Sequence, residues 1–422
     1  MDTIKGKVVG QRVLGGGLTA RGFGSDPLVQ ALRAGLRQFV EDLLIEEAKA
    51  VIGADVYERT PGRKGYRNGS LPRTLTTSLG PVSFDRPRVV LSEGGRPVEF
   101  QSHFLERYRR RAREVDAAVL GLYLGGVNTR KIKKALRPLL KNAPLSKSAV
   151  SRLIQRLKEA FEQWRERRLD KLAIRYVYLD GLFVKARCGG KVHRLPVLAV
   201  LGVTTDGRKV LLALETRGGE GEDAWKGVLD GLVARGLRKP RLLIVDGGAG
   251  LLAATSAVWP GVPRQRCAVH KLRNLLSHAP KALHEEIRDD FHAIVYAETR
   301  EKAATAYQAM ARKWRKVSEG VAKSLEEAGE EILTFFDFPE SQWKSLRTTN
   351  AIERLNEEFR RRTKSQVLFP TEGSVLVMLF GLVASGMVRL RRIEGWKDMA
   401  QAGDMRPSPG GGVAQESLAL AA

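Results

Sequence analysis

Two different spacings of hydrophobic residues run along the chain and predict where helices and strands form. Apolar residues three and four positions apart predict a helix over Pro27–Ile52. Residues 174–187, IRYVYLDGLFVKAR, alternate β-branched and aromatic residues with others, which predicts a strand. Two strands around a turn at 205–207, two helices, a buried strand ending before Asp246 and a short strand before Cys267 follow. The predicted order, β-β-β-α-β-α-β-α, is typical of a mixed sheet with helices on its faces.

The segments outside this sheet are predicted to be mainly helical. Residues 102–171 carry helical spacing, with two helices joined by a short turn, and the pattern stays helical for about eighty residues after His270. A polar helix begins near Asn350. Residues 53–100 differ, because Gly, Pro and Asn among basic residues predict a loop, followed by a short strand at 82–90.

These patterns divide the chain into an N-terminal half and an α/β half that is interrupted by helices. The uncharged stretch 373–388 is too short to span a membrane and is predicted to be a buried helix. Both ends of the chain lack periodicity. The predicted organisation is a flexible arm at 1–26, a helix with a basic loop and strand at 27–100, a helical region at 101–172, an α/β domain at 173–275 and 346–395, a helical insertion at 276–345, and a disordered tail at 396–422.

Positive charge is the strongest compositional feature of the chain. Its 422 residues include 72 Lys and Arg against 47 Asp and Glu, for a formal net charge of +25. This excess predicts a polyanionic partner, because each phosphate that Lys or Arg neutralises releases a counterion. No basic amphipathic anchor for a lipid surface stands out. Two cysteines, Cys188 and Cys267, exclude a disulfide framework. With no secretory signal visible, a cytoplasmic protein associated with the nucleoid is expected.

Basic residues gather in the N-terminal half, where DNA contact is the expected use. The two helices around 129–166 resemble a helix-turn-helix reader, and an ordinary basic helical hairpin is the alternative. The turn-rich loop around Arg67 is either a phosphate clamp or a solvated basic loop. Further arginines near Glu353 would hold a DNA backbone. The candidate DNA-binding residues are Arg67, Arg73, Arg130, Lys131, Lys133, Lys134, Lys147, Arg152, Arg156, Arg360 and Arg361.

Three acids stand where an open α/β sheet gathers its chemistry. Asp180 is expected to close the first strand and Asp246 to follow the buried strand, and ligands bind at the carboxyl ends of such strands. Glu353 lies in the first turn of the helix near Asn350. Three carboxylates suit Mg²⁺ or Mn²⁺, and two such ions can clamp both oxygens of a phosphoryl transfer. The alternatives are turn-forming Asp residues and a capping box from Asn350 to Glu353.

Longer motifs resemble the mutator-type transposases of bacterial insertion sequences. They are YVYLDGLFVKAR, LLIVDGGAGL, QRCAVHKLRN and RTTNAIERLNEEFRRRT in the α/β half, and GYRNGSLPRTLTTSLG, LGGVNTRKIKKAL and SAVSRL before it. The resemblance covers most of residues 40–390. It implies a ribonuclease H-like catalytic domain, with an Asp-Asp-Glu triad matched by Asp180, Asp246 and Glu353 and a helical insertion before the third acid. It also implies a Cys-x-x-His signature, matched by Cys267 and His270.

The resemblance implies a transposase that acts on double-stranded DNA. Such an enzyme binds terminal inverted repeats, cuts a strand at the element end and joins the freed 3′-hydroxyl to another phosphodiester, with two Mg²⁺ (or Mn²⁺) ions and no small-molecule cofactor. Pairing two ends implies a homodimer or a higher assembly. Cys267 and His270 are too few ligands for zinc. The alternatives are a metal-dependent nuclease of the same fold and a DNA-binding regulator derived from a transposase. Residues expected to support the active site are Cys267, His270, Asn350 and Arg354.

Overall fold

The computed structural model describes residues 27–106, 108–127, 129–136, 140, 145–188, 191–365, 369 and 371–399. These residues form two compact units, one ending at Gln155 and the other beginning at Arg156. The predicted arm at 1–26 and residues 400–422 of the predicted tail lie outside the described residues. Among the described helices, none is long and apolar enough to cross a membrane.

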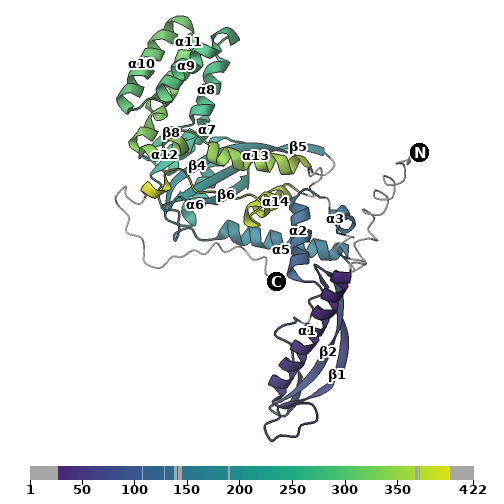
Figure 1. Ribbon diagram of the computed structural model, residues 1–422. Helices are drawn as coiled ribbons and strands as arrows, with labels where there is room; N and C mark the ends of the chain where they lie inside the picture. Colours follow the sequence, from purple (N-terminus) through teal and green to yellow (C-terminus); the bar gives the residue numbers. More distant parts are fainter. Residues whose placement is uncertain are drawn as a thin grey trace, which may run out of the picture. The chain divides into compact units, whose positions relative to one another are not determined.

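In the first unit, one long helix packs on a three-stranded antiparallel sheet. Helix α1 (Pro27–Ile52) has the predicted bounds, and it lies along strands β1 (Gly65–Thr77) and β2 (Gly80–Glu93), with β3 (Arg96–Glu99) on the far side of β2 (Figure 1). The helix and sheet share an apolar core because alternate strand residues face the helix. Its buried members include Leu44, Val82, Phe84 and Leu105.

The prediction of a basic loop with one short strand over 53–100 is therefore wrong. Gly and Pro residues that are typical of turns lie within strand β1. The pairing of β1 with β2 shifts between Arg67 and Ser70, and Gly69 within this bulge has a φ of +70°. Pro72 is tolerated because β1 is an edge strand of the sheet.

The rest of the first unit is helical. It contains α2 (Arg113–Leu124), α3 (Thr129–Ala135) and the start of α5 (Lys147–Glu166). Helix α2 buries one face, which includes Val115, Val119 and Leu124. Most of the connection between α3 and α5 lies outside the described residues, so the helix-turn-helix stays a prediction.

The second unit is built on a five-stranded mixed sheet, which confirms the predicted α/β class. Strands β4 (Ile174–Cys188), β5 (Lys191–Thr204) and β6 (Lys209–Thr216) are antiparallel. Strands β7 (Leu242–Val245) and β8 (Arg264–Arg266) run parallel to β4, and the order is β6-β5-β4-β7-β8. Helices α6 (Glu222–Ala234) and α7 (Ala249–Val258) share one apolar cluster with the sheet.

The two faces of β4 contact different helices because successive strand residues point to opposite sides. Val177 and Leu179 join the cluster with α6 and α7. Tyr176 and Tyr178 donate hydrogen bonds to α12 (Glu340–Leu346), at 2.6 Å to Gln342 Oε1 and 2.8 Å to the Ser345 carbonyl. Asp180 is the next residue on this second face. The expectation that Asp180 closes its strand is wrong, because β4 continues to Cys188.

Two further helices complete this unit around the sheet. Helix α13 (Asn350–Ser365) packs on β4, and its start agrees with the prediction. Helix α14 (Glu372–Ala384) is buried along most of its length, as predicted for the uncharged stretch. Its Phe380 packs against Phe161 and Trp164 near the end of α5, with ring centroids 5.6 and 5.1 Å apart.

A helical bundle with its own apolar core covers most of the segment 276–345 and begins earlier, with α8. It contains α8 (Ala268–Ser277), α9 (His284–Val295), α10 (Arg300–Val317) and α11 (Glu319–Ala328), which Figure 1 shows grouped together. Trp314, Phe291 and Leu325 are among its buried residues. A short 3₁₀ helix, η5 (Trp396–Met399), lies in the segment predicted as a disordered tail. That prediction is wrong for these four residues, because Met399 is buried and its carbonyl accepts from Arg175.

A buried ion cluster ties α11 of the insertion to β8 and α8. Arg266 and Lys271 have side chains only 3% and 2% exposed, and both donate to Glu327. The Arg266 contacts are 2.9 and 3.0 Å long, and the Lys271 contact is 2.7 Å. Glu327 itself is 50% exposed, which weakens the pairing relative to a fully buried one.

We expect Glu327→Ala to lower the free energy of unfolding by about 2–3 kcal/mol, because two buried cations lose their shared carboxylate. Glu326→Ala is the matched control on the same helix, since Glu326 pairs at the surface with Arg315, and it should cost less than about 1 kcal/mol. Urea denaturation of the three proteins measures both values. Equal losses in the two variants would contradict a role for the buried cluster.

Candidate active site

The pairing of two parallel strands sets Asp180 beside Asp246. The last residue pair between β4 and β7 joins Leu179 to Val245, so the next residue on each chain segment is an acid. Neighbouring strands lie about 4.8 Å apart, which keeps the two acids close. Strand β8 is level with them, because the backbone N–H of Cys267 donates to the Val245 carbonyl at 2.8 Å. Asp180, Asp246 and Cys267 therefore stand in a row across three strands.

Glycines beside the two acids leave room for other side chains. A Cβ at Gly181 would lie 2.3 Å from Glu220 Oε1, so the absence of a side chain leaves room for this fourth acid, whose pKa is affected by the charge of Asp246. Gly247 has a φ of +95°, and a Cβ there would lie 2.1 Å from Arg266 Nη2. The turn-forming use of Asp246 that the sequence left open is also real, since Asp246 Oδ1 accepts from the Gly248 N–H at 3.0 Å.

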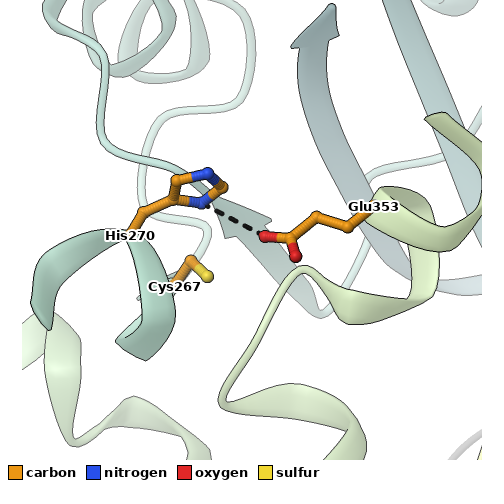
Figure 2. Close-up of side chains that lie close together, drawn as sticks. All are labelled: Cys267, His270 and Glu353. Atoms are coloured by element: carbon orange, nitrogen blue, oxygen red, sulfur yellow. Dashed lines mark ion pairs between the residues drawn. The ribbon is translucent and has the colours of Figure 1, made fainter. Parts of the chain in front are cut away.

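Glu353 enters the site from the first turn of α13. Its carboxylate accepts a hydrogen bond of 2.8 Å from the Thr349 hydroxyl and lies 3.5 Å from His270 Nδ1. Figure 2 shows the His270 imidazole and the Glu353 carboxylate pointing toward each other, with the Cys267 thiol beside them. Both partners of the Glu353 carboxylate are thus side chains of the site. In a capping box, this carboxylate would instead accept a hydrogen bond from the backbone N–H of Asn350.

The pKa of Asp180 reflects the other acids around it. Burial raises the pKa of this carboxyl, and so do the negative charges of Asp246 and Glu353, to about 7. The positive charge of His270 and a hydrogen bond from Asn356 act in the opposite direction. The pKa of Glu220 is raised as well, by burial and by the charge of Asp246. Carboxyl groups whose pKa is raised by burial and by neighbouring charges, as for Asp180 and Glu220, are typical of functional sites.

His270 and Cys267 form a polarised pair beside Glu353. Hydrogen bonding to Cys267 and the charges of Cys267, Glu353 and Asp180 raise the pKa of His270 to about 9, against the effect of burial. Burial alone would raise the pKa of the Cys267 thiol, but hydrogen bonds from His270 and Thr349 outweigh burial and lower it. The imidazole is therefore protonated at neutral pH and supplies a positive charge next to the three acids.

Cys267, His270 and Glu353 also have the donor set of a transition-metal site. Their ligand atoms lie within 4.8 Å of one another, and three protein ligands are enough for a catalytic zinc ion. The Thr349 hydroxyl lies 3.1 Å from Cys267 Sγ, 3.4 Å from His270 Nδ1 and 2.8 Å from Glu353 Oε1. One hydroxyl is therefore within hydrogen-bond distance of all three side chains. This arrangement favours a hydrogen-bonded network over a metal at this position.

Other predicted residues lie on the exposed face of α13 or in the N-terminal half. Asn350, Arg354, Arg360 and Arg361 are exposed, and the structure does not bring them together with the three acids. Arg73 donates to the carbonyls of Glu106 and Arg109, and Arg67 is half-buried. The side chains of Arg130 and Lys147 lie outside the described residues. The remaining candidates are exposed on α3 or α5: Lys131, Lys133, Lys134, Arg152 and Arg156.

Sequence reasoning missed three side chains that contact or neighbour the acids. Thr349 and Asn356 are fully buried at the start and in the second turn of α13, and Glu220 lies next to Gly181. The i, i+4 and i+7 spacing of Thr349, Glu353 and Asn356 was a usable signal, because it puts all three on one helix face. For Glu220 the sequence offers no such spacing.

The chain therefore has an α/β sheet, neighbouring acids beside its central strand and a large excess of basic residues, as expected for an enzyme that acts on a polyanion. The chain matches the family model described as "Transposase, Mutator family" over residues 22–388. It therefore belongs to the Mutator family of transposases, as the sequence motifs predicted.

Several transposases of bacterial insertion sequences are similar to this chain over most of their length. The chain is 35% identical over 351 residues to the transposase for insertion sequence element ISRM5 of Rhizobium meliloti (strain 1021), covering 83% of this chain and 86% of the relative. It is 36% identical over 352 residues to the transposase for IS406 of Burkholderia multivorans, covering 83% and 88%. The transposase for IS256 in transposon Tn4001 of Staphylococcus aureus is 31% identical, over 79% and 84%.

The raised pKa of Asp180 predicts how stability depends on pH when no divalent cation is present. The folded protein holds this proton up to about pH 7, whereas the unfolded chain releases it near 3.8. The contribution of Asp180 to stability therefore falls as pH rises through this window. We expect Asp180→Asn to match the wild type near pH 4 and to unfold at a higher temperature near pH 8, as measured by thermal unfolding in EDTA.

Asp206→Asn is a control for which the expected change in stability near neutral pH has the opposite sign. Hydrogen bonds from Thr204 and the charge of Arg208 lower the pKa of Asp206 despite partial burial. Its contribution to stability is present above the unfolded pKa of 3.8 and is lost as pH falls, so this variant should be less stable than the wild type near neutral pH. An Asp180→Asn protein that unfolds at the wild-type temperature at pH 8 would contradict the crowding of acids described above.

Proposed function

We propose that this member of the Mutator family is a transposase of the Asp-Asp-Glu type. It cuts a DNA strand at the end of its element by hydrolysis and joins the freed 3′-hydroxyl to another phosphodiester. Two observations carry the proposal: Asp180 and Asp246 directly follow the last residue pair between β4 and β7, and the charge of Glu353, on a helix that packs on β4, raises the pKa of Asp180. A ribonuclease H-like sheet is part of the proposal, and the mixed order of β4 to β8 supports it.

The three acids fit Mg²⁺ or Mn²⁺, two ions per site. Both ions prefer carboxylate oxygens, and a buried carboxyl whose pKa is raised by two neighbouring negative charges is relieved by a cation. Asp180, Asp246 and Glu353 would hold the ions. When bound, such ions stabilise the charge on the attacking and leaving oxygens of an in-line phosphoryl displacement.

The chain's own residues orient these acids. The Thr349 hydroxyl and the protonated His270 hold the Glu353 carboxylate from one side, through contacts of 2.8 and 3.5 Å. The second ring nitrogen of His270 is a donor that can bind a phosphate oxygen of DNA placed over the site. Because these partners are fixed in the folded chain, the site requires little rearrangement when DNA arrives.

The exposed basic residues of the N-terminal half are the proposed contacts to the ends of the element. Helix α3 exposes Lys131, Lys133 and Lys134 while it buries Ile132. Phosphate contacts of this kind position a protein on DNA without reading its sequence. Joining two ends requires two active sites, so a homodimer or a higher assembly on double-stranded DNA is part of the proposal.

Asp246→Asn should abolish cleavage and joining while the affinity for end DNA stays within about twofold. We expect the rate to fall by more than about a hundredfold, which exceeds the usual effect of residues that only contact a metal ligand. Asp230→Asn is the control, because Asp230 is an exposed acid that pairs with Lys226 on α6. Cleavage that survives Asp246→Asn would contradict the triad. Cleavage without joined products in the wild type would favour the nuclease alternative.

Binding to end DNA should weaken steeply as salt rises, because many phosphate contacts release counterions. Replacing Lys131, Lys133 and Lys134 together by Ala should reduce the slope of log affinity against log salt by about 0.9 for each phosphate that these lysines neutralise in the wild type. Lys226→Ala, which removes an exposed lysine from α6, should leave the slope unchanged. Fluorescence anisotropy over a salt series measures these slopes, and equal slopes in all three proteins would exclude α3 from the DNA interface.

A further inference from the structure

One buried amide contacts the first acid of the site. Asn356 is 0% exposed, and its Nδ2 donates a hydrogen bond of 2.6 Å to Asp180 Oδ2. It lies three residues after Glu353 on α13, and residues three apart share a helix face. A single helix therefore carries one of the acids and the hydrogen-bond donor to another.

The other end of the same amide has no partner. Asn356 Oδ1 is buried and accepts no hydrogen bond from the part of the chain that the structure describes. Buried polar atoms are nearly always hydrogen-bonded, so an unpartnered acceptor beside a group of carboxylates indicates a missing donor. The water shell of a divalent cation consists of such donors, and Mg²⁺ keeps several of its waters when it binds to a protein.

Gln342 on α12 is a second buried amide that contacts β4, and it serves as a comparison for Asn356. It is also 0% exposed and also bonds to a side chain of β4, since its Oε1 accepts from the Tyr176 hydroxyl at 2.6 Å. Its Nε2 donates to the Gly395 carbonyl at 3.4 Å, so both ends of this amide are used. Asn356 differs in two respects: its partner is a carboxylate, and its amide oxygen is left without one.

We propose that Asn356 is a positioning residue of the active site, which holds one oxygen of Asp180 and leaves the other free for a divalent cation. Its amide oxygen accepts a hydrogen bond from the water shell of that cation. Because Asn356 and Glu353 share α13, the helix also fixes the separation of Asp180 from Glu353. This inference rests on the proposed function, since it assumes that Asp180 binds a metal ion.

The test compares Asn356→Leu with Gln342→Leu in the full-length protein. Both changes replace a buried amide by an apolar side chain of similar size, and only the first removes a bond to a carboxylate. Calorimetric titration with Mn²⁺ in the absence of DNA is the primary measurement. We expect Asn356→Leu to weaken Mn²⁺ binding by about 10- to 100-fold, the usual effect of losing a residue that orients a metal ligand. Gln342→Leu should lower the unfolding temperature and leave Mn²⁺ affinity unchanged.

Strand cleavage gives an independent second measurement. In Asn356→Leu, the Mn²⁺ concentration that gives half-maximal cleavage should rise by a similar factor, while the affinity for end DNA stays at the wild-type value. Mn²⁺ binding within twofold of the wild type, or an equal loss in Gln342→Leu, would overturn the proposal. If Asn356→Leu is not recovered folded, Asn356→Ser, whose side chain is shorter and adds no apolar group, should show the same loss of Mn²⁺ affinity.

A separate variant distinguishes a failure of this inference from a failure of the proposed function. Asp180→Asn should abolish Mn²⁺ binding if Asp180 is a ligand. Wild-type Mn²⁺ affinity in Asp180→Asn would overturn the metal site itself, and with it the role of Asn356. Loss of binding in Asp180→Asn together with full binding in Asn356→Leu would overturn the role of Asn356 alone.

Discussion

The parallel pairing of β7 with β4 is the constraint on which the rest of the site depends. Its register joins Leu179 to Val245, so Asp180 and Asp246 become neighbours although β5, β6 and α6 separate them along the chain. A shift of one residue would turn Asp180 to the opposite face, where Val177 and Leu179 pack against α6 and α7. The two tyrosines before Asp180 oppose such a shift, because their hydroxyls bond to α12 on the face that the acid shares.

Negative charges held this close require compensation, and the chain supplies part of it. His270 brings a positive charge from the start of the insertion, and Asn356 brings a hydrogen-bond donor from α13. The pKa of Asp180 nevertheless stays near 7, because burial and the charges of Asp246 and Glu353 outweigh this compensation. The insertion thus contributes to the site as well as to the bulk of the protein. The bonds of Glu327 to Arg266 and Lys271 hold the helix that bears His270 against the sheet.

Periodicity and motifs predicted the α/β half well, because its strands are apolar runs and its helices are either amphipathic, as α13 is, or apolar throughout, as α14 is. The start of α13 and the buried α14 agree with the expected segments, and so do the bounds of α1 in the first unit. The sheet of the first unit was missed because Gly69 and Pro72 are typical of turns, and only the pairing with β2 reveals a bulge and an edge strand. Asp180 was expected at the end of its strand. Hydrophobic alternation alone does not show that β4 extends well beyond the end of its pairing with β7.

The sequence predicted the three acids, whereas the helical spacing that relates Thr349 and Asn356 to Glu353 was not used. Thr349 and Asn356 lie in the motif from which Glu353 and the neighbouring arginines were selected. Both are fully buried, but residue type alone does not predict burial of a Thr or an Asn. Their roles depend on contacts that span much of the chain, such as the bond from Asn356 to Asp180. The Thr349 hydroxyl also lies within hydrogen-bond distance of Cys267, His270 and Glu353, and so links the three side chains in one network. In the proposed mechanism this network orients Glu353, which binds a hard cation together with Asp180 and Asp246.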